Sequence, residues 1–477
     1  MIHHDLVIRH GTVVTDRWVA AADIAIADGR IAAIGPELDG DSREEIDAGG
    51  LHLLPGVIDA HVHFNEPGRT EWEGWATGSR AVAAGGGTTC FDMPLNAHPP
   101  TLDAASFGLK LAAAEAAALT DFALWGGLVP GTLDRLPELA ECGVIGLKAF
   151  MSQSGTDDFA AADDLTLYEG MREAARLGLI VAVHAESDAI TSRLAARAIA
   201  AGQTTARDYL ASRPVIAELE AISRAILLAE EAGCALHVVH VSTGRGFELI
   251  AAAKARGVDV SCETCPHYLF FTEDDIERLG AIAKCAPPLR SGPEQTALWD
   301  KLRSGELPMV ASDHSPAPAT MKGGDDFFQV WGGISGCQST LPALLTAGYH
   351  QRGLSLPLIA SLSAGYVAHR FRLPAKGRLE PGADADIALV DLEHVWTLSA
   401  GDLHDRHKLS PFTGQAFRGV VRRTLLRGHT IFRDGQFSAN PAGRLVRPEP
   451  RAEPPPGQAS TTASVAPYAD TEPRETR

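Results

Sequence analysis

Polar side chains that could serve metal chemistry lie at the ends of several apolar segments of this sequence. His61 and His63 are two residues apart at the end of one segment, and this spacing places both imidazoles on one face of a β-strand. Four further polar side chains occur late in other apolar segments: Lys148, His184, His240 and Asp313. Imidazole nitrogen and carboxylate oxygen are ligands for zinc and similar ions. These residues therefore predict metal-assisted chemistry if the fold brings them together.

Lys148 is the least ordinary of the six because it lies inside the apolar run Gly146–Phe150. Burying an unpaired ammonium group is costly, so something must neutralise this amine or use it. The other five positions each have a structural alternative, since a histidine at a strand end is commonly a hydrogen-bonded packing residue. We interpret the remaining fourteen of the 18 histidines in that way, His10 and His350 among them. The joint occurrence of all six at strand ends favours a functional site.

The elements that must position these residues alternate between two types. Stretches rich in helix formers, such as 101–119, 166–177, 216–232 and 244–256, separate the apolar segments. Eight strands are predicted: 56–63, 88–93, 121–129, 144–151, 179–186, 235–243, 258–266 and 309–316. Strand–helix alternation repeated eight times predicts an α/β fold, a (β/α)₈ TIM-type barrel. Because catalytic groups of such barrels lie at the carboxyl ends of the strands, we expect the six side chains to meet at one rim.

The two ends of the chain have a different pattern, with short alternating segments separated by turn signals such as Asp28-Gly29. Strands are expected at Leu6–Val14, Asp23–Ile34, Ala385–Asp391, Val420–Arg427 and Thr430–Phe437. We therefore predict a small β-sandwich domain built from residues 1–53 plus 376–446, and a barrel domain over 54–375. Residues 447–477 are rich in Pro, Glu, Ser, Thr and Arg, and they are predicted to form a disordered tail.

Charge and composition exclude several classes of function. The formal net charge is −18 and no basic stripe is visible, so a nucleic-acid partner is not expected. No secretion signal and no apolar run of about 18 residues occurs, so we expect no membrane association and a cytoplasmic location. Cys262 and Cys265 form a CxxC pair without a second pair or a nearby histidine at zinc-site spacing, and buried thiols are the simpler interpretation.

Around the six positions the sequence resembles the amidohydrolase superfamily, and within it the cyclic amidase group of allantoinases, hydantoinases and dihydroorotases. The resemblance covers roughly residues 1 to 440. It rests on five segments: Pro55–His63, Gly146–Phe150, His184–Glu186, His240–Ser242 and Ser312–Pro316. It implies an enzyme that hydrolyses a cyclic amide, with a small-molecule partner and, by analogy, a homo-oligomer (tetramer or dimer).

The resemblance also implies a cofactor and a set of roles. Two divalent metal ions are expected, zinc by ligand type, with cobalt or manganese as alternatives. His61, His63 and Asp313 would hold one ion, and His184 and His240 the other. Lys148 would carry a carbamate shared by both, which would turn the buried cation into an anion. A hydroxide between the ions would attack the ring carbonyl, and Asp313 would be the catalytic proton carrier.

The loop after His63 indicates which ring is hydrolysed. Dihydroorotases carry an arginine, which pairs with the substrate carboxylate, where this chain has Asn65; an amide cannot match that pairing. The segments Asn65–Gly74, Asp92–Asn96 and Gly332–Gly336 resemble allantoinases closely, which implies hydrolysis of allantoin to allantoate in purine and ureide breakdown. Substrate contacts are expected from Asn96, Ser315, Pro287 and Leu289.

Several alternatives stay open at this stage. Asn96 could instead form an Asx turn, Ser315 could serve the turn before Pro316, and Arg69 could form a loop salt bridge rather than contact substrate. Ala317 replaces a cysteine that is common in the family, which bears on the substrate loop only. The alternative functions are a hydantoinase or dihydropyrimidinase, and a non-catalytic scaffold. All six ligand positions are filled, which favours an enzyme.

Overall fold

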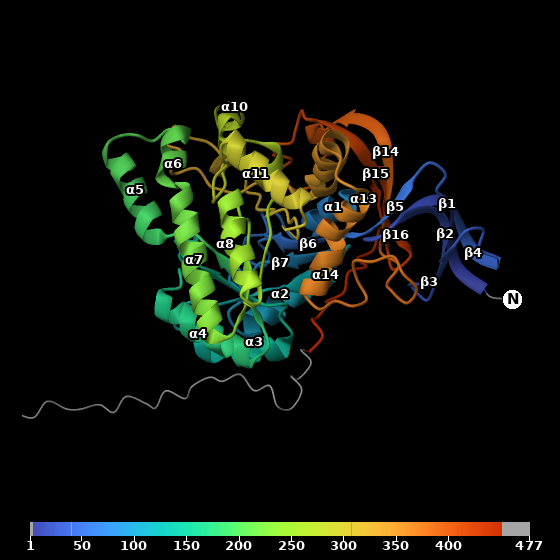
Figure 1. Cartoon of the computed structure of the whole chain (residues 1–477), viewed down its shortest axis with the longest axis horizontal. Helices are drawn as coiled ribbons and strands as arrows, with labels where there is room; N and C mark the ends of the chain where they lie inside the picture. Colours follow the sequence, from blue (N-terminus) through green and yellow to red (C-terminus); the bar gives the residue numbers. More distant parts are fainter. Residues whose placement is uncertain (1–2, 40, 307, 451–477) are drawn as a thin grey trace, which may run out of the picture.

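Two parallel sheets form the barrel of this protein. The computed structural model describes residues 3–39, 41–306 and 308–450, and Figure 1 shows the barrel helices surrounding the strands. One sheet has the order β6-β7-β8 and the other the order β13-β12-β11-β10-β9. Their strands are β6 Val57–Val62, β7 Gly87–Asp92, β8 Asp121–Leu124, β9 Gly126–Gly127, β10 Leu147–Phe150, β11 Ile180–His184, β12 Ala235–Val238 and β13 Val260–Cys262.

The eighth predicted strand, 309–316, is not a regular strand, which corrects the sequence prediction. It closes the barrel through two isolated parallel bridges, Thr264 with Val310 and Val62 with His314. Asp313 has a φ of 48°, whereas strand residues need negative φ. This left-handed residue interrupts the ladder at the rim, where it turns the Asp313 side chain away from the regular alternation.

Helices cover the outside of the barrel, and several begin at side-chain caps. Asp103 caps α2 through the backbone of Ser106, and Thr205 caps α6 through Asp208; such caps satisfy the free N–H groups of the first helical turn. The helices are α1 Trp75–Ala84, α2 Ala104–Ala117, α3 Leu136–Cys142, α4 Asp164–Arg176, α5 Asp188–Ala200, α6 Ala206–Ser212, α7 Val215–Ala232, α8 Gly244–Ala255, α9 Pro266–Phe270, α10 Ile276–Leu279, α11 Gly292–Arg303, α12 Thr340–Ala343, α13 Leu356–Ala360 and α14 Tyr366–Arg370.

The strands from both chain ends form one nine-stranded sheet beside the barrel, at the right of Figure 1. Its order is β17-β16-β15-β14-β5-β1-β2-β3, and β4 pairs with β1. The strands are β1 His3–Val14, β2 Val19–Ala27, β3 Arg30–Gly35, β4 Asp41–Asp47, β5 His52–Pro55, β14 Ile387–Thr397, β15 Ala416–Leu426, β16 His429–Arg433 and β17 Gln436–Phe437. Antiparallel pairing of β5 with β14 joins the two ends. The predicted fold class, a TIM-type barrel with a small β-sandwich domain from both termini, is confirmed for the barrel and for a β-domain built from both chain ends.

The predicted turn at Asp28-Gly29, and a second Asp-Gly turn between β16 and β17, have the geometry that their residue types favour. Asp28 and Gly29 have φ values of 52° and 74°, and Asp434 and Gly435 have values of 46° and 82°. Two successive residues with positive φ are characteristic of the type I′ turns that join antiparallel strands.

The chain continues past the sheet and returns to the barrel, which corrects the predicted start of the tail. Val446 N donates to Phe122 O at 2.7 Å, and Glu449 N donates to Arg372 O at 2.9 Å. Residues 447–450 are therefore held against the barrel rather than belonging to a disordered tail. The rest of that predicted tail, 451–477, lies outside the described residues.

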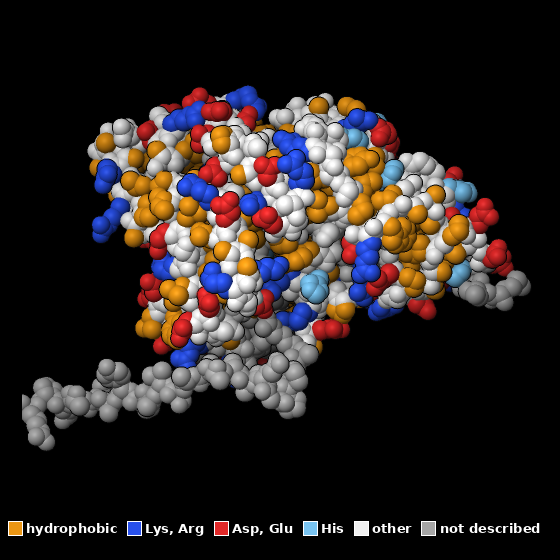
Figure 2. Space-filling model, in the orientation of Figure 1, with side chains coloured by type: hydrophobic (Ala, Val, Ile, Leu, Met, Phe, Trp, Pro, Cys, Tyr) orange, Lys and Arg blue, Asp and Glu red, His pale blue; other side chains and the backbone are white. Residues whose placement is uncertain are grey.

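Three features of the molecule bear on the expectations from composition: its charged side chains, its thiols and its helices. Acidic and basic side chains are interspersed on the face shown in Figure 2. Cys262 and Cys265 are buried thiols, as expected. Across the described ranges, no helix combines the length and the apolarity needed to cross a bilayer.

Candidate metal centre and substrate cavity

His61, His63 and Asp313 come together at the carboxyl end of the barrel. The Nε2 atom of His61 lies 3.1 Å from Asp313 Oδ1, and the Nε2 atom of His63 lies 3.4 Å from the same oxygen. Both histidines are buried, and the Asp313 side chain is 13% exposed. The ligand atoms of the three residues all lie within 4.8 Å of one another. This spacing could hold a metal ion.

The hydrogen bonds of the two imidazoles assign their protons. Nδ1 of His61 lies 2.6 Å from a carboxylate oxygen of Glu263, and Nδ1 of His63 lies 3.3 Å from the Leu95 carbonyl. Both partners accept only, so each Nδ1 carries a proton. Burial lowers the pKa of His61. This favours a neutral ring, in which Nε2 carries a lone pair. The lone pairs of His61 and His63 then face the negatively charged carboxylate of Asp313. A cation bound among the three groups would remove the repulsion between them.

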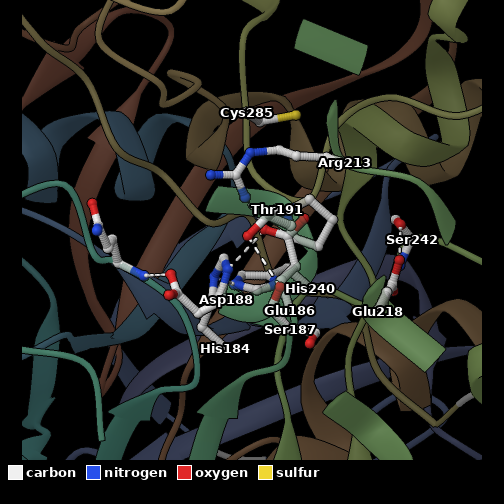
Figure 3. A network of polar contacts seen from close by, with 12 residues as sticks. His184, Glu186, Ser187, Asp188, Thr191, Arg213, Glu218, His240, Ser242 and Cys285 are labelled. Atoms are coloured by element: carbon white, nitrogen blue, oxygen red, sulfur yellow. Dashed lines mark hydrogen bonds and ion pairs between the residues drawn. The ribbon is translucent and has the colours of Figure 1, made fainter. Parts of the chain in front are cut away.

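His184 and His240 form a second pair beside the first. Nδ1 of His184 and Nε2 of His240 are 3.0 Å apart, and Nε2 of His184 lies 2.9 Å from Glu186 Oε2 (Figure 3). Because Glu186 accepts the Nε2 proton, Nδ1 of His184 carries a lone pair, which faces Nε2 of His240. Burial lowers the pKa of both histidines. The rings of His61 and His240 are 5.4 Å apart between centroids, so the two pairs belong to one site.

Lys148 is buried from solvent on β10, with 0% of its surface exposed. Its Nζ has no hydrogen-bond partner within the described chain, and it lies 4.9 Å from the centroid of the Phe150 ring. Burial lowers the pKa of this amine to about 7, although the negative charges of Asp313 and Glu263 oppose the shift. The unpaired buried amine expected from the sequence is therefore present. The structure brings all six predicted residues to the same end of the barrel.

Two buried glutamates that the sequence interpretation missed support the histidines. Glu263 follows β13 and contacts both His61 and His237, the latter at 3.1 Å. Burial acts to raise the pKa of Glu263, but the two histidines outweigh it and hold the pKa at about 2. Glu186 likewise has a pKa near 2, because Arg213 and His184 outweigh its burial. The available signal was a carboxylate directly after an apolar strand, as in Val260–Cys262 followed by Glu263.

A cavity of about 410 Å³ opens at this site, and His63, His184 and Asp313 line it. Its volume lies in the range of small-molecule sites, roughly 300–1,000 Å³. The wall also contains apolar and polar side chains from β10, from α6 and from several loops: Leu95, Asn96, Phe150, Tyr209, Arg213, Lys284, Ser315 and Trp331.

Two of the four predicted substrate contacts line the cavity and two do not. Asn96 and Ser315 line it, and within the described residues neither side chain has a hydrogen bond to protein that would satisfy it. The predicted contacts from Pro287 and Leu289 are corrected by the structure. The Pro287 carbonyl accepts a hydrogen bond from Tyr268 Oη at 2.7 Å, and Leu289 is buried in the apolar core. Cys285 and Ala286, from the same loop, line the cavity instead.

The loop after His63 supports the cavity wall, but its Arg69 side chain is not among the residues that line the cavity. Arg69 Nη1 donates to the Asn96 carbonyl at 2.8 Å, and Nη2 lies 3.0 Å from Asp158. Arg69 therefore holds the backbone of Asn96, as its loop-bridge interpretation requires. Asn65 is buried with a φ of 63° and is not among the residues that line the cavity.

Asp121, Asp384 and Asp386 form another carboxylate cluster, between the barrel and the sheet. Its centre is filled by the ammonium group of Lys376, which lies 2.9 Å from Asp384 and 2.8 Å from Asp386. Three carboxylates around a buried lysine form an ion-pair network. The cluster therefore has a structural explanation.

Comparison with known proteins agrees with this site. Residues 52–431 match the model of the amidohydrolase family. The chain is 63% identical to an allantoinase from Rubrobacter xylanophilus and 61% identical to one from Solibacter usitatus; each match covers 93% of this chain, with 98% and 97% of the relatives. An L-hydantoinase (dihydropyrimidinase) structure from Arthrobacter aurescens superposes with a TM-score of 0.91 at 36% identity, covering 93% of this chain and all of that one. The chain belongs to the amidohydrolase family.

Proposed function

We propose that this protein is an allantoinase, which hydrolyses the ring amide of allantoin to give allantoate. The proposal is supported by relatives of that name that are 43–63% identical over 93% of the chain. The observation that carries it is the joint geometry of the site. Two histidine groups and Asp313 surround a buried, unpaired lysine beside a cavity of small-molecule size.

Membership of this family implies a binuclear divalent metal centre, and the residues present fit it. His61, His63 and Asp313 would hold one ion, and His184 and His240 the second. The fit rests on His61, His63 and Asp313. The unprotonated Nε2 atoms of the two histidines face the Asp313 carboxylate with no proton between them. Imidazole and carboxylate ligands suit zinc, and cobalt or manganese are the alternatives. When bound, the ions would supply Lewis acidity and lower the pKa of the attacking water.

Lys148 is proposed to carry a carbamate that both ions share. The neutral amine adds to carbon dioxide, which forms an N–C bond and releases one proton. A pKa of about 7 leaves much of this amine neutral near physiological pH. The product is an anion, and an anion between two cations is a better occupant of this buried position than an ammonium group.

Asp313 is proposed to move the proton during ring opening. Its side chain lines the cavity and is 13% exposed, so it can reach both water and substrate. It would take a proton from the attacking water and deliver it to the ring nitrogen as the C–N bond breaks. Asn96 and Ser315 would orient the ring, because both line the cavity with polar groups that protein atoms leave available.

Hydantoin hydrolysis is the second candidate function. It is favoured by the Arthrobacter aurescens hydantoinase structure, with a TM-score of 0.91. The two reactions use the same ring amide and the same residues, and they differ in the group attached to the ring. The substituent, rather than the metal site, therefore separates the two candidates.

The test is metal analysis followed by turnover of defined rings. Purified protein should contain two divalent ions per chain and open one or both enantiomers of allantoin faster than hydantoin or dihydrouracil. Faster opening of hydantoin would favour the second candidate. A protein with two ions and no turnover of any of these rings would contradict both.

A further inference from the structure

Two cationic side chains line the cavity, and only one of them has hydrogen-bond donors to offer a ligand. Lys284 Nζ donates to the carbonyls of Phe327, at 2.7 Å, and Val330, and it lies 3.4 Å from that of Phe328. An ammonium group has three donors, so this lysine is committed to the loop that it holds. The Arg213 guanidinium has five N–H donors, and its one hydrogen-bond partner among the described residues is Glu186, bound through Nη1.

Arg213 is held in place before any ligand arrives. It lies in the turn between α6 and α7, and its carbonyl accepts a hydrogen bond from the Arg290 guanidinium. Its Cζ lies 5.5 Å from the centroid of the Tyr209 ring, and Glu186 fixes Nη1 (Figure 3). The side chain is 20% exposed and lines the cavity. The remaining guanidinium nitrogens are therefore available at a fixed position in the cavity wall.

The charge around Arg213 indicates what these donors would recognise. Glu186 is buried, with 0% of its side chain exposed, and it is an ion-pair partner of Arg213. The positive charge is thus already compensated, which makes the site less suited to a carboxylate and better suited to a neutral carbonyl oxygen. A planar guanidinium can still donate to such an oxygen with good geometry.

The position of Arg213 indicates which part of the substrate it would contact. Arg213 enters from the turn between α6 and α7, whereas Asp313 and the histidines lie at the carboxyl ends of the barrel segments. A ring amide placed at Asp313 would leave the ring substituent to meet Arg213. This step rests on the proposed allantoinase function, because allantoin carries a ureido group with one carbonyl oxygen.

We propose that Arg213 is a specificity-determining residue, whose free guanidinium nitrogens donate to the carbonyl oxygen of the substituent outside the hydantoin ring. Glu186 keeps the guanidinium in this orientation. The same interaction distinguishes a ureido group from a hydrocarbon substituent, which offers no acceptor. Arg213 does not take part in bond breaking.

The test uses Arg213→Lys, which keeps a cation for Glu186 but removes the planar donor edge. Arg245→Lys is the matched control, because Arg245 is 58% exposed and pairs with Glu294 on the surface. We measure kcat and KM for allantoin, Ki for unsubstituted hydantoin, and bound metal for both variants and the wild type. Arg213→Lys should raise KM for allantoin about 10- to 100-fold with little change in kcat, Ki or metal content. The control should match the wild type.

A second measurement compares inhibitors, first on the wild type and then on Arg213→Lys. The inhibitors are two hydantoins whose substituents have equal length, one with an amide carbonyl and one with only hydrocarbon. Tighter binding of the carbonyl compound by the wild type, lost in Arg213→Lys, supports the proposal. Equal binding by the wild type overturns it, and so does an equal loss of hydantoin and allantoin binding in the variant. Wild-type protein that does not hydrolyse allantoin overturns the proposed function itself, and the control variant would then be inactive as well.

Discussion

Glu263 lies 2.6 Å from Nδ1 of His61, on the opposite side of the ring from Asp313. Glu186 stands in the same relation to His184, at 2.9 Å from Nε2. Each half of the proposed metal site therefore has its own buried carboxylate, which fixes the tautomer and the orientation of one ligand. These two contacts make the halves separable by mutation.

We predict that Glu263→Gln and Glu186→Gln weaken different metal ions. The substitution keeps the size of the side chain but removes its charge, so the affinity of the adjacent ion should fall about 10- to 100-fold. Titration with a chelator, followed by metal analysis, should show one loosely held ion in each variant. Each variant is the control for the other. Equal loss of both ions in both variants would contradict separate support.

The prediction from sequence succeeded where residue type and spacing were sufficient. The barrel strands were predicted because buried parallel strands are continuous apolar runs, and the six site residues because each lies at the end of one. Glu263 and Glu186 were missed because their roles depend on contacts with His61 and His184, and a single sequence does not record such contacts.

The failures also have physical causes in particular residues. The segment 309–316 has strand composition, but the left-handed Asp313 interrupts its pairing. Contacts from Leu289 and Pro287 were expected from the resemblance to the cyclic amidases, whereas the fold buries Leu289, and the Pro287 carbonyl accepts a hydrogen bond from Tyr268. The tail boundary was misplaced because composition does not reveal that the chain returns to Phe122.

Lys148→Ala should leave the protein folded but unable to hold the shared ions. The alanine removes the amine that is proposed to become the bridging carbamate, so metal content and turnover should both fall strongly. A short-chain carboxylic acid such as acetate or propionate could occupy the space and restore part of the activity. Metal analysis and activity with and without the acid check this. Full activity and two bound ions in the variant without acid would refute the bridging role.

Asp313→Asn should separate metal binding from proton transfer. The amide oxygen can still face the ions, so most of the metal should remain. It cannot carry a proton, so kcat should fall by about 10²–10⁴-fold, the usual contribution of general acid–base catalysis. The check is kcat measured alongside metal content by mass spectrometry. A kcat equal to that of the wild type would exclude Asp313 as the proton carrier.

Lys322→Met should loosen the loop that forms one wall of the cavity. Lys322 Nζ lies 3.0 Å from the Trp331 carbonyl and also contacts that of Gly333. Removing the Lys322 ammonium leaves these two carbonyls without this hydrogen-bond donor. The free energy of unfolding should therefore fall by about 1–3 kcal/mol. KM for the substrate should rise while metal content is unchanged. Arg303→Met, which removes an exposed ion pair with Asp300, is the control, and equal effects of the two variants would contradict the role of the loop.

Two truncations should test whether residues 441–450 stabilise the barrel. Ending the protein at residue 450 removes none of the hydrogen bonds between Val446 or Glu449 and the barrel, so the melting temperature should be unchanged. Ending it at residue 440 removes them and should lower the melting temperature by a few degrees. Calorimetry of both proteins beside the full chain provides the comparison. Equal melting temperatures for the two truncations would show that residues 441–450 do not stabilise the barrel.

The most direct test of the metal centre is anomalous diffraction from crystals grown with zinc, collected on both sides of the zinc absorption edge. We expect two strong anomalous peaks, one beside His61, His63 and Asp313 and one beside His184 and His240, with density joining Lys148 to both. Ordered side chains at these positions with no anomalous peak between them would contradict it.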